Sequence, residues 1–257
     1  METLGNVCAL ASRCSNAFGP SCNDLCSPFL LTHGVTGTGG YWKGRNVPKK
    51  YQDAFLANLP IKQDNPVAYA FIQRYVSEVV ENVRNGIGFF LHSIPNANNR
   101  LGTGTGKTTA AVTILNEYLI ARLIEHSKGG EQIQGQPALF FKASEFQTLY
   151  NSQFRGTPDM QDKASIRFYH VKEMLMKTDL LVLDDIGIRQ KITDAFENEL
   201  TEVIDARDTR ELATIYTSNL PIERLADTLG DRIVSRIQGT TEQIAFKGQD
   251  HRRKGIL

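Results

Sequence analysis

The sequence predicts an α/β protein built on a parallel sheet with helices on both faces. Short apolar runs alternate with amphipathic segments of helical length, a glycine-rich loop follows the first run, and paired aspartates end the third. The runs at 88–94, 138–141, 179–185 and 212–219 are mostly too apolar to alternate, which is typical of strands buried on both faces. Strands separated by helices favour a parallel sheet.

Helices are expected between these runs, at about 66–86, 108–127, 144–151, 163–177 and 193–208. In the first of them, apolar residues recur at helical spacing. Asn65 can cap its amino end, Pro66 suits the first helical position, and Gly86 can end it. An amphipathic helix therefore leads into the core.

Composition limits the class of protein. The chain has 257 residues, 41% of them hydrophobic and 22% charged, which is ordinary for a folded globular protein of two unequal domains. We expect a small module at 1–45, a linker at 46–65 and the main domain at 66–257. Lys and Arg number 29 against 28 Asp and Glu, so any contact with nucleic acid must be local. No apolar run is long enough to span a membrane, so we expect no membrane partner and a cytoplasmic location.

The glycine loop LGTGTGKTT lies between an expected strand and an expected helix, as a phosphate-binding loop does. Its backbone N–H groups and the helix start would cradle the phosphates of ATP. The consensus G-x-x-x-x-G-K-[ST] is met except at its first glycine, where Leu101 stands after a long polar lead-in, PNANNR. Lys107 is expected at the terminal phosphates and Thr108 on magnesium. The residues expected to hold the nucleotide are Gly102, Thr103, Gly104, Thr105, Gly106, Lys107, Thr108 and Thr109.

The run LLVLDDIG supplies the second half of the site. Asp184 would enter the magnesium shell, and Asp185 could orient the attacking water. Asp is one methylene shorter than the Glu usual at that place in such ATPases, so we expect slow hydrolysis. Asn219 ends the fourth run and would sit between these carboxylates and the terminal phosphate.

Together these motifs resemble the DnaC/DnaI type of bacterial and phage replicative helicase loader, over roughly residues 45–257. The resemblance rests on GTGKTTAA, LLVLDDIG, TSNLPIERL and LGDRIVSRI in that order and spacing, and on VPKKYQDAFLANLP at 47–60. It implies an AAA+ P-loop NTPase with a five-stranded sheet of order 5-1-4-3-2 and ATP bound next to a neighbouring subunit. It also implies that Arg236 acts on that neighbour's ATP with Arg232 as companion, and that Arg252 or Arg253 reads the nucleotide.

Such loaders are expected to be ATPases that deliver a hexameric DnaB-type helicase onto single-stranded DNA and to associate with themselves through the ATP site. Segment 141–156 offers Lys142, Arg155 and aromatic residues for DNA. A core role for Phe146, Leu149 and Tyr150 is the stronger expectation. The helicase would be gripped by the N-terminal part.

Four cysteines, Cys8, Cys14, Cys22 and Cys26, form the pattern C-x5-C-x7-C-x3-C at the N-terminus. Without a secretion signal, disulfides are disfavoured and metal ligation is the better interpretation. Four thiolates fit tetrahedral zinc, with His33 as a spare ligand, and an iron–sulfur cluster uses the same ligand set. We expect zinc and leave the cluster and free structural thiols open.

Three other functions share parts of this pattern. An ATPase subunit that regulates a DNA transposase (IstB-like) has similar motifs but typically lacks the cysteines. A small-molecule phosphotransferase would need neither an arginine from a neighbour nor an oligomer. A metal-dependent DNA-binding module could use ATP only as a switch. The cysteine cluster favours the loader over the transposase subunit.

Overall fold

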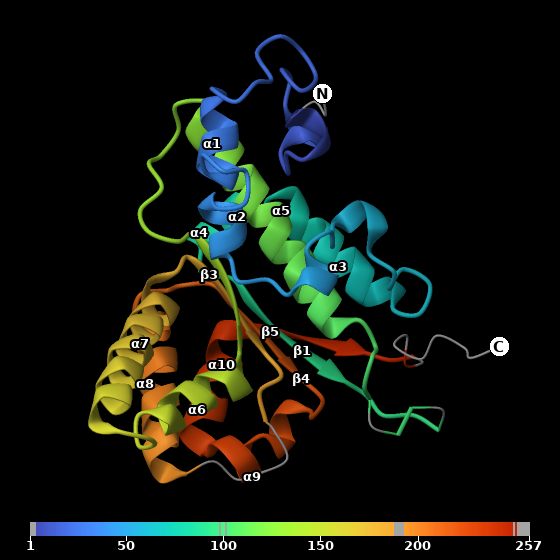
Figure 1. The fold of residues 1–257 in the computed structure, drawn as a ribbon. Helices are drawn as coiled ribbons and strands as arrows, with labels where there is room; N and C mark the ends of the chain where they lie inside the picture. The colour runs from blue at the N-terminus through green and yellow to red at the C-terminus, as the bar shows by residue number, and fades with distance from the viewer. Residues whose placement is uncertain (1–3, 98, 101, 188–192, 249, 251–257) are drawn as a thin grey trace, which may run out of the picture.

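A computed structural model describes residues 4–97, 99–100, 102–187, 193–248 and 250. Five strands form one parallel sheet of order β2-β3-β4-β1-β5 (Figure 1). Their bounds are β1 Gly88–Ser93, β2 Ala138–Lys142, β3 Leu180–Asp184, β4 Thr214–Ser218 and β5 Thr241–Phe246. The expected order 5-1-4-3-2 is this same order counted from the other edge, so the predicted fold class is confirmed for the sheet.

Helices connect the strands and cover both faces. The longer ones are α3 Pro66–Ser77, α5 Lys107–Ser127, α6 Ala143–Ser152, α7 Pro158–Lys177, α8 Asp194–Thr209 and α10 Asp231–Thr240. The shorter ones are α1 Ser27–His33, α2 Gly40–Gly44, α4 Val79–Arg84 and α9 Ala226–Leu229, with 3-10 turns η1 Leu4–Asn6, η2 Ala11–Arg13, η3 Lys49–Tyr51, η4 Leu56–Asn58 and η5 Ile222–Arg224.

Alternate residues of each strand pack into two separate hydrophobic cores, because successive side chains of a strand point to opposite faces of the sheet. On one face, Phe89 and Leu91 pack with α3, α4 and α5. On the other, Phe90 packs with the helices α6 to α10, which lie together in Figure 1. The sheet is therefore buried on both sides, as its continuous apolar strands predict.

Helix α5 is buried almost all round, although its sequence predicts only one apolar face. Asn116 and Glu117 are 0% and 2% exposed. Asn116 Nδ2 donates to Ala54 O at 2.9 Å, and Glu117 accepts hydrogen bonds from the Leu56 N–H and from Arg13. Residues 4–61, the wrapping segment, thus cover the outer side of the helix that starts at the glycine loop.

Arg45 is the main anchor of this wrapping segment, at 1% exposure. Its Nε donates to Asn116 Oδ1 at 2.9 Å, and its guanidinium lies 3.5 Å from the centre of the Trp42 ring. Burial lowers the pKa of Arg45 to about 9. Segment 34–49, whose glycines predict a loop, therefore contains α2 and a buried cation that the sequence did not single out.

The expected helix 66–86 is two helices, α3 and α4, separated at Glu78 (φ −128°, ψ 36°). Asn65 precedes α3 but makes no side-chain cap. Its amide instead donates to Lys247 O at 2.8 Å and accepts from Lys247 N at 2.6 Å, which ties α3 to the end of β5. Among the described residues, no helix combines the length and the hydropathy that crossing a bilayer requires.

Candidate nucleotide site

A cleft of about 480 Å³ opens at the carboxyl ends of the strands, where the glycine loop meets the two aspartates. This is the edge at which parallel α/β sheets bind their ligands. The cleft brings together residues from β3, β4, the loop and the N-terminal wrapping segment. Its lining residues are Lys50, Tyr51, Pro60, Gly104, Thr105, Gly106, Lys107, Thr108, Thr109, Lys142, Ser144, Asp184, Asp185, Thr217 and Asn219.

The glycine loop has the conformation its sequence predicts. Gly102, Gly104 and Gly106 have φ values of 61°, 67° and 99°, a region that side chains with a Cβ rarely adopt. A Cβ on Gly106 would also stand 2.5 Å from Ile61 of the wrapping segment. Each of the three positions therefore requires glycine, and the loop runs directly into α5.

The polar lead-in to the loop is a closed turn. Asn96 and Asn99 bridge each other through their backbones, and the Asn99 side chain, 7% exposed, donates to Thr103 O at 2.7 Å and accepts from Thr103 N at 3.2 Å. Leu101 lies outside the described residues. Asn99 thus fixes the start of the loop, a role that its place in a run of asparagines did not indicate.

Lys107 is buried at the centre of the cleft, with 7% of it exposed. Its Nζ contacts the Ser93 hydroxyl at the end of β1, Gly102 O at 3.2 Å and Asn219 Oδ1 at 2.9 Å. The Ser93 hydroxyl also donates to Gly102 O at 2.5 Å. Ser93 therefore links the first strand to the loop, although sequence reasoning did not select it.

Asp184 lies beside Thr108, as the pairing for magnesium requires. The Thr108 hydroxyl and the Thr217 hydroxyl each donate to Asp184 Oδ1 at 2.8 Å. Burial raises the pKa of the Asp184 carboxyl, while these hydroxyls partly oppose the rise. A buried carboxylate next to a hydroxyl is the oxygen donor set that Mg²⁺ prefers, so these two residues fit that ion.

Asp185 is exposed and has a left-handed backbone, φ 59°. Such a conformation in a residue other than glycine costs about 1–3 kcal/mol and persists only where contacts hold it. Here its N–H donates to Thr217 Oγ1 at 2.9 Å, and its carboxylate accepts from Asn219 Nδ2 at 3.1 Å. The strained turn directs Asp185 toward the cleft, away from the buried face that Asp184 occupies.

A third carboxylate, Asp250, lies against the loop. Thr103 Oγ1 donates to Asp250 Oδ2 at 3.0 Å, and a Cβ on Gly104 would collide with the same side chain. The segment after β5 therefore crosses the glycine loop. Arg252 and Arg253, one of which is expected to read the nucleotide, lie outside the described residues.

Arg232 and Arg236 lie on α10 and contact carboxylates of α8. Arg232 pairs with Asp205 at 2.5 Å, and Arg236 pairs with Asp205 and Asp208, both at 3.1 Å. Their side chains are 68% and 47% exposed. Neither is among the described residues that line the nucleotide cleft, so both present their charge at the surface.

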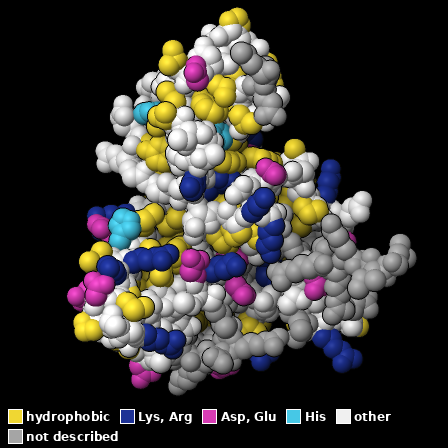
Figure 2. All heavy atoms as spheres, viewed as in Figure 1, with side chains coloured by type: hydrophobic (Ala, Val, Ile, Leu, Met, Phe, Trp, Pro, Cys, Tyr) yellow, Lys and Arg dark blue, Asp and Glu magenta, His cyan; other side chains and the backbone are white. Residues whose placement is uncertain are grey.

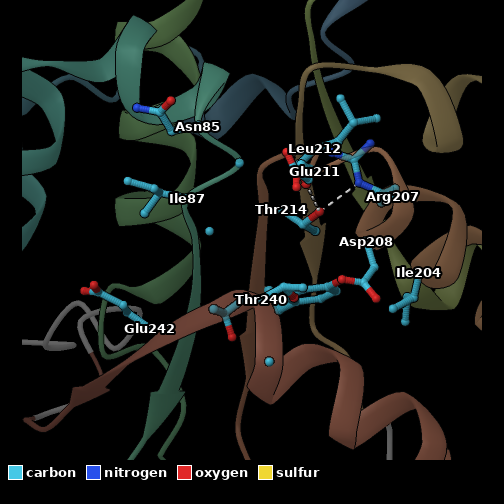
Figure 3. A pocket seen from close by; sticks show the side chains of 15 residues that line it. Asn85, Ile87, Ile204, Arg207, Asp208, Glu211, Leu212, Thr214, Thr240 and Glu242 are labelled. Carbon is cyan, nitrogen blue, oxygen red and sulfur yellow. Dashed lines mark hydrogen bonds between the residues drawn. The ribbon is translucent and has the colours of Figure 1, made fainter.

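A second cleft, also of about 480 Å³, lies at the amino ends of β1, β4 and β5 (Figure 3). Its wall contains Arg207, which is 1% exposed and donates to Thr214 Oγ1, Leu175 O and Ala213 O, each at 2.7 Å. Burial lowers the pKa of Arg207 to about 10. Because backbone and hydroxyl oxygens satisfy this guanidinium, its role is to hold strand and helix ends together.

The helix α6 has a buried face and an exposed end. Phe146 and Leu149 are 0% and 8% exposed, which confirms their expected place in the core, and Tyr150 packs against it. Phe154 just beyond the helix is 66% exposed, next to exposed Arg155. A groove of about 370 Å³ runs between α6 and α7, lined by Thr148, Asn151, Ser152, Arg155, Gly156, Met160 and Ala164.

All four cysteines line one small cavity of the N-terminal module. Burial raises the pKa of the Cys8 thiol, and the neighbouring thiols raise it further. His33 is not available as a ligand through Nε2, because that atom accepts the Ala9 N–H at 3.0 Å. In the described part of the chain, no group of three or more His, Cys, Asp and Glu is arranged to hold a metal ion. The expectation of zinc therefore gains no support from the structure.

Fold and site together define a P-loop nucleotide-binding protein with the parallel five-stranded sheet of the AAA+ type. A profile of the family described as "IstB-like ATP binding protein" matches residues 159–255. A solved structure described as "Crystal structure of the DnaC helicase loader" superposes with a TM-score of 0.55 and 24% identity, over 78% of this chain and 100% of that chain. This likeness shows the shared fold.

Curated proteins named "Replicative helicase loader DnaC" are similar in sequence. The one from Buchnera aphidicola subsp. Baizongia pistaciae is 26% identical over 153 residues, which cover 59% of this chain and 54% of that protein. The one from Buchnera aphidicola subsp. Schizaphis graminum is 24% identical over 206 residues, which cover 79% of this chain and 71% of that protein. The chain thus spans about half the length of the first relative. These comparisons confirm the resemblance to DnaC-type replicative helicase loaders.

Proposed function

We propose that this chain is an ATP-dependent helicase loader that delivers a DnaB-type replicative helicase onto single-stranded DNA. The observation that carries the proposal is the continuous contact Lys107–Asn219–Asp185 across a nucleotide cleft, in a chain similar over 79% of its length to a curated loader. These contacts link the phosphate-binding lysine to the carboxylate that would act on water. ATP binding can therefore reposition the groups that govern hydrolysis.

ATP would place its phosphates on the N–H groups of the glycine loop and its terminal phosphate against Lys107. Thr108 and Asp184 would hold Mg²⁺, which neutralises charge between the phosphates when bound. Asp185, turned outward by its left-handed backbone, would accept a hydrogen bond from the attacking water. Because aspartate is short, we propose that water is held loosely and that hydrolysis is slow.

The base of the nucleotide would lie against the wrapping segment. Lys50, Tyr51 and Pro60 line the cleft together with the glycine loop. The Lys50 ammonium stands 4.4 Å from the centre of the Tyr51 ring in a cation–π contact, and an aromatic base would stack on Tyr51. This contact would couple nucleotide binding to the segment that joins the N-terminal module to the ATPase domain.

The exposed arginines of α10 support self-association through the ATP site. Arg236 lies outside its own cleft and would neutralise charge on the nucleotide of a neighbouring copy, with Arg232 beside it. In the single chain both are held by Asp205 and Asp208. Such exposed pairs contribute only about 0–1 kcal/mol, so a phosphate can displace the carboxylates.

Single-stranded DNA would bind at the groove between α6 and α7. Exposed aromatic and apolar side chains there can stack on bases, and Arg155 can contact phosphate. Met160, 58% exposed, lines the groove, and Phe154, 66% exposed, follows α6 beside Arg155. Helix α6 begins directly after Lys142, which lines the nucleotide cleft, so the same element would serve both ligands.

The helicase would bind the N-terminal module. Val7, Phe18 and Leu25 are 54%, 60% and 81% exposed. Hydrophobic side chains gather on this part of the surface, at the top of the view in Figure 2. Exposed apolar side chains grouped on one small module are typical of a protein interface.

The proposal is tested by measuring whether the chain forms a complex with the helicase. The full chain, the matching replicative helicase and a single-stranded oligonucleotide are mixed with ATP, ADP or no nucleotide, and complexes are measured by size-exclusion chromatography with light scattering. We expect a complex with the helicase that depends on ATP. Absence of a complex under every nucleotide condition would overturn the proposal.

Two variants locate the contacts in that assay. Leu25→Asp should abolish helicase binding while Leu56→Asp, within the packed wrapping segment, should instead unfold the protein in thermal melts. Phe154→Ala should weaken DNA binding at unchanged helicase binding. Val67→Ala, equally exposed on the distant α3, is the matched control and should change neither.

A second candidate is an ATPase that regulates a DNA transposase, favoured by the match of residues 159–255 to the IstB-like profile. It shares the nucleotide site and the arginines. Stimulation of ATP hydrolysis by a transposase, without binding to the helicase, would favour it over the loader.

A further inference from the structure

The last residue of β1, Ser93, lies behind Lys107. Ser93 is 1% exposed, and it is not among the described residues that line the nucleotide cleft, whereas Lys107 is. Its hydroxyl is within hydrogen-bond distance of three groups of the glycine loop, which are Gly102 O at 2.5 Å, Thr105 Oγ1 at 3.1 Å and the Lys107 ammonium. Ser93 therefore contacts the loop from outside the cleft and acts on a nucleotide only through the loop.

These three contacts use the full hydrogen-bonding capacity of one hydroxyl. A serine hydroxyl donates one hydrogen bond and accepts two. The carbonyl of Gly102 can only accept, so the Ser93 hydroxyl donates to it and accepts from the Thr105 hydroxyl and the Lys107 ammonium. Thr105 is also 1% exposed, and hydrogen bonds in such a buried setting are stronger than in water. The Ser93 hydroxyl is thus fixed with its hydrogen toward the loop backbone and its lone pairs toward the ammonium.

The contact with Gly102 secures the place where the loop departs from the consensus. In the sequence, Leu101 stands at the first glycine position and Gly102 follows one place later. Gly102 has a left-handed φ of 61°, and a Cβ added to it would stand 2.5 Å from Ser93 Cβ. The loop backbone therefore passes directly against Ser93, and the hydroxyl fastens this shifted turn to the end of β1.

The same hydroxyl determines where the Lys107 ammonium is needed. Lys107 Nζ lies 3.2 Å from Gly102 O on the loop side and 2.9 Å from Asn219 Oδ1, on a residue that lines the cleft. A buried carbonyl needs a donor, and Ser93 supplies one to Gly102 O. Without this hydroxyl, Gly102 O would depend on the ammonium, and Lys107 would be drawn away from the cleft.

We propose that Ser93 is a positioning residue for ATP binding, which keeps the Lys107 ammonium toward the terminal phosphate by donating to the Gly102 carbonyl in its place. The inference rests on the proposed binding of ATP at the glycine loop. Because Ser93 acts through Lys107 and does not contact the nucleotide, its effect on ATP affinity must disappear when the lysine is removed.

A double-mutant cycle measured by isothermal calorimetry tests this role. Ser93→Ala, Lys107→Ala and the double variant are compared with the wild-type chain for their affinity toward ATP with magnesium. Ser93→Ala should weaken ATP binding about tenfold, the effect of one hydrogen bond to a charged group. In the Lys107→Ala chain the same change should alter the affinity less than about twofold, because residues that act through each other are not additive. An unchanged affinity in Ser93→Ala, or an equal loss in both chains, would overturn the proposal.

Ser218→Ala is the matched control for lost stability. Ser218 is 0% exposed at the end of β4, and its hydroxyl donates to Ile186 O at 2.8 Å, outside the glycine loop. Both serine variants should lower the melting temperature, while Ser218→Ala should keep ATP affinity within about twofold. Equal weakening of ATP binding by both variants would contradict a role through Lys107. Normal ATP binding by Lys107→Ala would instead refute the proposed nucleotide site itself, and this inference with it.

Discussion

Lys107 Nζ lies 2.9 Å from Asn219 Oδ1, and the amide nitrogen of the same Asn219 lies 3.1 Å from the Asp185 carboxylate. One amide thus connects the glycine loop with the end of β3, although the three residues are far apart in sequence. Because the amide oxygen accepts and the amide nitrogen donates, the Asn219 side chain contacts the Lys107 ammonium and the Asp185 carboxylate in one fixed orientation. A phosphate that draws Lys107 away would release Asn219 and, through it, Asp185.

Lys107→Ala should remove most nucleotide affinity. A hydrogen bond to a charged group contributes about 1.5–3 kcal/mol, so we expect ATP affinity to fall roughly ten- to a hundredfold in isothermal calorimetry. Lys128→Ala, exposed at the other end of α5, is the control and should bind normally. Equal affinity in both variants would mean that the loop does not hold the phosphates.

Asn219→Ala should separate binding from turnover. We expect turnover to fall about a hundredfold, the cost of displacing a reacting group by roughly 1 Å, while ATP affinity changes little. Steady-state hydrolysis and calorimetry on the same preparation measure the two effects. Asn151→Ala on α6 is the control. A loss of affinity without a loss of turnover would assign Asn219 to binding.

Arg236→Ala should affect hydrolysis in the assembly and leave the single chain intact. An arginine supplied by a neighbour contributes about a thousandfold or more, so turnover per chain should fall and lose its rise with protein concentration. Its exposed pairs with Asp205 and Asp208 predict a change of stability below about 1 kcal/mol. Arg224→Ala, exposed on η5, should behave as wild type. Concentration-independent turnover in the wild-type chain would contradict this role.

Asp250→Asn should strengthen nucleotide binding. The Asp250 carboxylate contacts Thr103 of the glycine loop and so repels incoming phosphates. Two charges 4 Å apart in water interact by about 1 kcal/mol, which predicts roughly fivefold tighter binding at low salt and less at high salt. Calorimetry at two ionic strengths measures both effects. Asp64→Asn is the control. Weaker binding by Asp250→Asn would show that the carboxylate supports the loop.

Arg207→Met should destabilise the fold without touching the nucleotide cleft. Methionine would leave the carbonyls of Leu175, Thr178 and Ala213 without their donor. Each unsatisfied buried group costs about 1–3 kcal/mol, so the free energy of unfolding should fall by at least about 3 kcal/mol in urea. Arg210→Met, three residues on and at the surface, should cost below about 1 kcal/mol.

Much of the fold followed from local pattern. Continuous apolar runs predicted the strands β1 to β4, because strands buried on both faces cannot alternate. The fifth strand, Thr241–Phe246, lies at an edge of the sheet. Its Glu242 and Gln243 are exposed, so the strand contains no continuous apolar run. Only the family resemblance predicted this fifth strand. The break at Glu78 left no mark in the periodicity, since both helices keep their apolar faces.

The sequence by itself determined the chemistry of the nucleotide site. The glycines, Lys107 and Thr108 are contiguous, and their conformation depends on backbone freedom that glycine alone provides. Asp184 ends β3, whereas Asp185 lies beyond the strand in a left-handed turn with φ 59°, which the sequence did not indicate.

Only the tertiary structure decided which distant groups meet. Ser93 and Asn99 support the glycine loop through hydrogen bonds. Nothing in the sequence distinguishes these two residues from other polar residues, so their role could not be predicted. The outer side of α5 is covered because its Asn116 and Glu117 have buried partners in the N-terminal segment, Arg45 and Leu56, and this pairing depends on how the whole chain packs. The convergence of four cysteines on one cavity is of the same kind, because spacing alone allows many arrangements of thiols and packing selects one.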